Sequence, residues 1–153
     1  MGHDISIIKK KTKDPNYPDE YVHEYHNCFP VVGCGTYACD LVDGELVPRT
    51  LQESIYITYN NSGMYSLAME NIGHPQKCFG RWLNDSKTNK VLPILELLFD
   101  ELITNPKIYE PLQPKINPET NTRWGGYDDL CNKIYALIFA CRKYPKATIR
   151  DSY

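Results

Sequence analysis

The sequence predicts an α+β fold, in which an antiparallel sheet from the N-terminal half is packed by two long C-terminal helices. Two observations favour it: strand-like patterns occupy residues 3–59, and long helical patterns follow at 90–104 and 127–144. Because strands come first and helices later, a layered α+β arrangement is favoured over alternating β-α-β units. The length of 153 residues fits one domain, residues 1–153.

The strand predictions depend on alternation of apolar and polar side chains. In the first strand Ile5 and Ile7 share a face, and in the clearest strand Ile55 and Ile57 do so. The predicted strands are residues 3–8 and 21–26, a glycine-shaped strand or loop at 31–40, a hairpin pairing 41–42 with 46–47 across Asp43-Gly44, and 54–59.

The helix predictions depend on apolar residues at three-to-four spacing. The first helix begins near Lys90 and ends at Asn105-Pro106, and the second spans 127–144 and ends before Pro145. Residues 60–85 are expected to be irregular, with a short helical turn at 65–69. Residues 105–126 contain four prolines and predict a long loop, a kind of segment that is often functional.

Composition excludes some classes of function. The formal net charge is −2, which argues against a dedicated nucleic-acid binder, because phosphate binding favours a basic excess. No apolar run is long enough to span a bilayer, and the N-terminus lacks the apolar core of a signal peptide, so we expect a cytoplasmic protein without membrane contact. The opening Met1 to Ser6 fits the loose myristoylation motif, but it reads better as the start of a strand.

In a reducing cytoplasm the six cysteines are expected to be reduced and mostly buried. Cys131 and Cys141 fit this expectation because they belong to a helical pattern.

One local cluster offers metal-ligating and nucleophilic side chains: His23, His26, Cys28 and Cys34. Its spacing matches no standard zinc pattern, and on a strand the two histidines would point to opposite faces. No cysteine–histidine signature, phosphate loop or nucleophile elbow occurs. The sequence therefore predicts no metal site, no cofactor and no catalytic residue, and it favours binding over catalysis.

A set of polar and aromatic residues is better suited to holding a ligand. Tyrosine and tryptophan offer flat faces for a base and polar tips for hydrogen bonds, and an arginine can fork onto a phosphate or carboxylate. The plain alternative is a half-buried sheet with ordinary aromatic neighbours. The candidate ligand-binding residues are Thr36, Tyr37, Tyr59, Asn60, Asn61, Arg81 and Trp124.

Four stretches carry a resemblance across most of the chain. They are Asp4-Ile5-Ser6, Gly35-Thr36-Tyr37-Ala38, Ile57-Thr58-Tyr59-Asn60 and Leu92-Pro93-Ile94-Leu95-Glu96. With them, the chain resembles a family of small uncharacterised proteins of bacteriophages and bacterial genomes. It departs from the family pattern at Cys34, where another glycine is more usual, and in a longer segment between Tyr37 and Ile57.

The resemblance implies a phage accessory protein in the host cytoplasm, of the kind that counteracts host defence. Three hypotheses follow. The first is sequestration of a small nucleotide-like signal by the candidate ligand-binding residues. The second is a protein-interaction inhibitor that docks on a host enzyme through residues 105–126. The third is a small nucleotide-acting enzyme that uses a histidine or cysteine within residues 23–39. Self-association is left open.

Overall fold

The computed structural model describes residues 2–8, 29, 31–32, 39–42, 45–48, 51–52, 54–76 and 78–152. The strands are β1 (Gly2–Ile8), β2 (Val31–Val32), β3 (Cys39–Val42), β4 (Glu45–Pro48), β5 (Leu51–Gln52), β6 (Ile55–Thr58) and β7 (Thr148–Ser152). The helices are η2 (Tyr59–Asn61), α1 (Ser62–Asn71), α2 (Phe79–Leu83), α3 (Thr88–Thr104), α4 (Pro106–Tyr109), η3 (Glu110–Leu112) and α5 (Tyr127–Lys143). The α+β prediction is confirmed.

The main sheet has three antiparallel strands in the order β6-β1-β7, so β1 lies in the centre. Ile5 is opposite Ile55 on one side and Asp151 on the other, and Ile7 is opposite Ile149. Directly opposed residues share a face. The four isoleucines of this row are fully buried, which makes this face the floor of the core.

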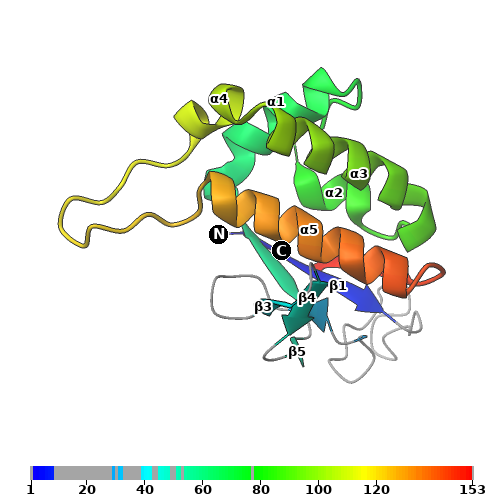
Figure 1. Cartoon of the computed structure of the whole chain (residues 1–153). Coiled ribbons are helices and arrows are strands. Elements are labelled where there is room, and N and C mark those ends of the chain that lie inside the picture. Colours follow the sequence, from blue (N-terminus) through cyan, green and yellow to red (C-terminus); the bar gives the residue numbers. More distant parts are fainter. Residues whose placement is uncertain are drawn as a thin grey trace, which may run out of the picture.

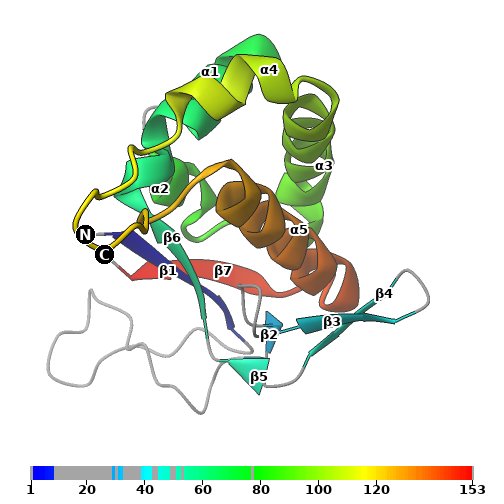
Figure 2. The same cartoon turned by 60° about the vertical axis from the view of Figure 1, so that its left-hand side comes forward.

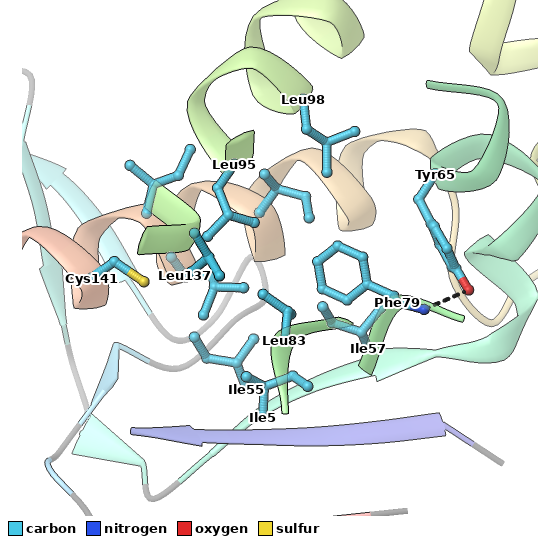
Figure 3. Packing of buried hydrophobic residues seen from close by; sticks show 14 of the residues in the cluster. Ile5, Ile55, Ile57, Tyr65, Phe79, Leu83, Leu95, Leu98, Leu137 and Cys141 are labelled. Atoms are coloured by element: carbon cyan, nitrogen blue, oxygen red, sulfur yellow. Dashed lines mark hydrogen bonds between the residues drawn. The ribbon is translucent and has the colours of Figure 1, made fainter. Parts of the chain in front are cut away.

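The helices cover that face of the sheet, with α3 and α5 packed side by side (Figures 1 and 2). Figure 3 shows Leu95 and Leu98 of α3 and Leu137 of α5 above the sheet isoleucines, beside Phe79 of α2. Each of these side chains is fully buried. Burial of one such side chain stabilises the fold by about 1.5–3 kcal/mol.

The strand β7 was missing from the sequence predictions, whose last element is the helix at 127–144. It completes the sheet by pairing with β1 over Asp4 to Ile8. The chain between α2 and α3 lies along its other side, where Asp85 N donates to Ile149 O at 2.8 Å and Ile149 N donates to Ser86 O at 2.9 Å. Only tertiary pairing makes this short, polar segment a strand.

Residues 60–85 are more regular than predicted. They form η2, α1 and α2, and the predicted turn at 65–69 is the middle of the ten-residue helix α1. Alanine, leucine, methionine and glutamate favour helix there, and Gly73, with φ of 82°, follows the end of α1. The hairpin prediction is confirmed by β3 and β4, whose register pairs Leu41 with Leu46.

The two long helices are confirmed with small changes of boundary. α3 begins at Thr88, two residues before the predicted start, and Pro93 lies inside the helix. The predicted loop at 105–126 is shorter than expected, because α4 and η3 occupy residues 106–112. The predicted strand at 21–26 lies outside the described residues. In the described part of the chain, no helix is long and apolar enough to cross a membrane.

Candidate functional site

One corner of the molecule gathers several polar side chains from distant parts of the sequence. β1 starts there, β7 ends there, and β6 leads there into η2 and α1 (Figure 2). His3 and Asp151 both belong to the face of the sheet that carries the buried isoleucines. They are the polar members of an otherwise apolar row, so each needs a hydrogen-bond partner.

These two residues supply that partner to each other. His3 Nδ1 lies 2.9 Å from Asp151 Oδ2 and 3.1 Å from Oδ1. The side chains are 3% and 7% exposed, respectively. Because the carboxylate only accepts hydrogen bonds, the proton of a neutral imidazole resides on Nδ1 and its Nε2 is left as an acceptor.

The Nε2 side of the ring faces a cysteine. Cys78 Sγ lies 3.7 Å from His3 Nε2, within reach of a sulfur hydrogen bond, and the cysteine is partly exposed. Tyr59 stacks on the imidazole, with ring centroids 5.4 Å apart. The imidazole therefore contacts a carboxylate, a thiol and an aromatic ring.

The segment of Cys78 is held in place by α1. The amide of Phe79 donates to the Tyr65 hydroxyl at 3.0 Å (Figure 3). Burial raises the pKa of Tyr65 above its ordinary value, and the Phe79 hydrogen bond partly opposes this rise. Tyr65 therefore stays a neutral phenol at physiological pH.

Gly80 lets α2 lie directly on the histidine–aspartate pair. A Cβ at this position would lie 1.9 Å from Asp151 Oδ2 and 2.4 Å from His3 Nδ1. Real side chains do not tolerate such contacts, so a glycine is needed here for close packing rather than for a special backbone angle.

Asn61, a candidate ligand-binding residue, forms hydrogen bonds within the fold. It is fully buried, its Oδ1 accepts from Gly126 N at 2.8 Å, and its Nδ2 donates to Asp129 Oδ2 at 3.0 Å. Asp129 also pairs with Lys133 at 3.1 Å. Asn61 therefore ties the end of β6 to the start of α5.

Four other candidates lie on the surface. Asn60 Nδ2 donates to the backbone oxygen of Trp124 at 3.1 Å, which brings these two residues together. Tyr59 directly precedes Asn60 and is 38% exposed, while the side chain of Trp124 is 66% exposed. Arg81 is exposed on α2, immediately after Gly80.

The remaining candidates, Thr36 and Tyr37, lie outside the described residues, as do His23, His26, Cys28 and Cys34.

Two surface grooves lined by described residues lie elsewhere. One, of about 590 Å³, lies between α3 and α5 and is lined by residues that include Leu97, Phe99 and Tyr135. The other, of about 350 Å³, lies beside Phe29 and Tyr144. Neither groove includes a candidate ligand-binding residue. Within the described residues, no group of three or more histidine, cysteine or acidic side chains is placed to hold a metal ion.

Sequence reasoning missed His3, Cys78 and Asp151. One signal was available for His3, because it alternates along the strand with Ile5 and Ile7 and so falls on the same, buried face. A polar side chain on that face needs a polar partner. No local signal existed for the other two, since Asp151 is 148 positions and Cys78 is 75 positions from His3.

Comparison of the chain with protein-family models, curated proteins and solved structures finds no match.

We expect Gly80→Ala to lower the free energy of unfolding by about 1–3 kcal/mol, because the new methyl group displaces the Asp151 carboxylate or α2. Gly63→Ala is the matched control, since its Cβ would meet only Leu112 O at 4.0 Å, and it should be neutral or stabilising by less than about 1 kcal/mol. Urea denaturation measures both. Equal effects of the two changes would contradict the close approach at Gly80.

We expect Asn61→Ala to lower the free energy of unfolding by about 2–4 kcal/mol, because the buried amide of Gly126 loses its acceptor and Asp129 loses a donor. Asn60→Ala is the control, since it removes only an exposed hydrogen bond and should cost less than about 1 kcal/mol. Urea denaturation separates the two, and a fully stable Asn61 variant would remove the structural role.

Proposed function

We propose that this protein acts by binding another protein, and that residues 103–124 carry the contact surface. The observation that supports this most is the distribution of exposed apolar side chains. Seven large hydrophobic residues are exposed in the described part of the chain, and five of them lie between 103 and 124. These five are Ile103, Ile108, Leu112, Ile116 and Trp124. Such concentration of exposed apolar side chains is typical of protein-interaction sites.

The shape of the segment supports the same proposal. Residues 113–124, here called the docking loop, project away from the helices and the sheet (Figure 1). A projecting loop reaches into a concave partner better than a flat face does. Trp124 gives it a large aromatic anchor, and Arg123 stands next to it; tryptophan and arginine are enriched among residues that dominate binding energy.

Hydrogen bonds hold the docking loop in one conformation. At its tip Asn117 N donates to Thr122 O at 2.7 Å, and Glu119 N donates to Asn117 Oδ1 at 2.9 Å. At its base Gln113 Oε1 accepts from Tyr127 N at 3.2 Å. A loop that is ordered before binding loses less entropy when it binds. The docking loop is therefore suited to tight recognition.

The resemblance to small bacteriophage proteins directs the search for the partner. It favours a bacterial protein, such as a host defence enzyme, that the docking loop would block. This partner needs an apolar pocket for Trp124 or Ile116, and its rim would meet the charges of Lys115, Glu119 and Arg123.

We expect Trp124→Ala to raise the Kd for such a bacterial partner by about 30-fold or more, because loss of a central tryptophan costs about 2 kcal/mol or more. The partner is first captured from bacterial lysate with the wild-type chain and purified, and the Kd values are then measured by calorimetry. Leu97→Ala is the matched control, since Leu97 is also exposed but belongs to α3. An equal loss of affinity in both variants would contradict docking through the loop.

A second candidate function is sequestration of a small nucleotide-like ligand. One observation favours it: Tyr59, Asn60 and Trp124 are exposed and share a corner, and Asn60 hydrogen-bonds to the Trp124 backbone. A base could stack on either ring while the amide oxygen or nitrogen of Asn60 reads its edge.

The ligand hypothesis is tested by thermal unfolding in the presence of mono-, di- and cyclic nucleotides. A ligand at about 100 times its Kd should add about 2.7 kcal/mol, which corresponds to a Tm increase of roughly 5–10 °C for a chain of this size. Tyr59→Ala should abolish the increase, whereas Tyr135→Ala, on α5, should keep it. Absence of any shift with the wild-type chain would count against sequestration.

A further inference from the structure

The thiol of Cys78, the imidazole of His3 and the carboxylate of Asp151 form a continuous line of contacts. Sγ lies 3.7 Å from Nε2, and Nδ1 lies 2.9 Å from Oδ2. This is the order of nucleophile, base and orienting acid that activates cysteine and serine nucleophiles in enzymes of unrelated fold. None of the proposed binding functions uses it.

The protonation states follow from the contacts. Asp151 holds the Nδ1 proton, so Nε2 can take the proton of the thiol, and the carboxylate then stabilises the imidazolium that results. The thiolate, not the thiol, is the reactive form of cysteine. Among the described residues, the titratable groups that face the thiol and the imidazole are Asp151 from β7, Tyr59 from η2 and Tyr65 from α1.

The exposure of the three residues suits a reaction at sulfur. His3 is buried and the side chain of Asp151 is 7% exposed, and the pairing of β1 with β7 and the close cover of Gly80 fix both residues. Cys78 is partly exposed, as a reaction with a reagent from solvent requires. The base is thus held rigidly while the nucleophile is open to attack an electrophile.

The backbone amide next to Cys78 indicates which class of electrophile the thiol can attack. Attack on a carbonyl group builds an oxyanion, which enzymes stabilise with backbone amides near the nucleophile. Here the amide of Phe79, next to Cys78, is already bonded to the Tyr65 hydroxyl at 3.0 Å. Attack on a disulfide builds no oxyanion, because the attacked sulfur carries no oxygen and the negative charge passes to the leaving sulfur. The geometry therefore favours a disulfide over an ester or amide.

We propose that Cys78 is a nucleophilic thiol, activated by His3 and positioned through Asp151, that exchanges with low-molecular-weight disulfides such as glutathione disulfide. His3 Nε2 takes the thiol proton, and Sγ attacks one sulfur of the disulfide. The sulfur–sulfur bond breaks, and its electron pair leaves on the second sulfur, which takes the proton back from His3. The products are a mixed disulfide at Cys78 and one free glutathione. The sulfur of Cys78 is oxidised, and the sulfur that leaves as glutathione is reduced.

The test is the rate of modification of each cysteine by glutathione disulfide, followed by peptide mass spectrometry on the full chain. At pH 7 we expect Cys78 to react about tenfold or more faster in the wild type than in His3→Gln, because the variant lacks the base. At about pH 9.5, where a thiol ionises without help, the ratio should fall towards one. A loosened structure would instead raise the rate at both pH values.

Two other cysteines report whether the variant has kept its fold. Burial raises the pKa of Cys131 to about 11 and that of Cys141 to about 12, so both should stay unmodified at pH 7 while the chain is folded. If they react in His3→Gln, the comparison is made with Asp151→Asn, which keeps the imidazole and should slow Cys78 about threefold or more at pH 7.

Two results would overturn the proposal. One is an equal rate for Cys78 in the wild type and in a folded variant at pH 7. The other is steady hydrolysis of p-nitrophenyl acetate that Cys78→Ser abolishes, because that turnover would assign the triad to acyl transfer rather than to disulfide exchange.

Discussion

The antiparallel pairing of β1 with β7 is the interaction on which the rest of this structure depends. It joins the two ends of the chain in the centre of the core floor, with Ile7 opposite Ile149 and Ile5 opposite Asp151. The same pairing sets His3 and Asp151 as diagonal neighbours on one face, where they form their hydrogen bond. The position of α2, and therefore of Cys78, follows from the space that Gly80 leaves above this pair.

A second constraint links this sheet to the proposed docking loop. Asn61 binds both Gly126 and Asp129, so the end of β6 fixes the start of α5 and the point at which the loop returns to the fold. Gly125 fits this junction because it has a φ of 90°, and a Cβ there would lie 2.6 Å from Asn61 Oδ1. Polar contacts, rather than apolar packing, thus determine where the loop projects.

The sequence predicted the elements that have their own local pattern. Ile5 and Ile55 revealed their strands by alternation, and Leu95 and Leu137 revealed α3 and α5 by helical spacing. β7 escaped because only one of its five residues is a fully buried hydrophobic residue, Ile149, so its conformation comes from pairing with β1.

Part of the candidate site could likewise be predicted from the sequence, and part could not. Tyr59, Asn60 and Trp124 were selected by residue type, and the structure places them at one corner. His3, Cys78 and Asp151 could not be grouped from the sequence, because strand pairing and the fit of α2 on the sheet bring them together. A search for local clusters instead selected histidines and cysteines at 23–34, which lie outside the described residues.

The thiol and the proposed binding surface are connected by direct contacts. Cys78 touches His3, His3 stacks on Tyr59, and Asn60, the next residue, bonds to the backbone of Trp124 at the end of the docking loop. A group attached to Cys78 would occupy space beside the imidazole and its stacked tyrosine. The redox chemistry proposed for Cys78 and the recognition proposed for Trp124 are therefore linked by one chain of contacts, which runs through His3, Tyr59 and Asn60.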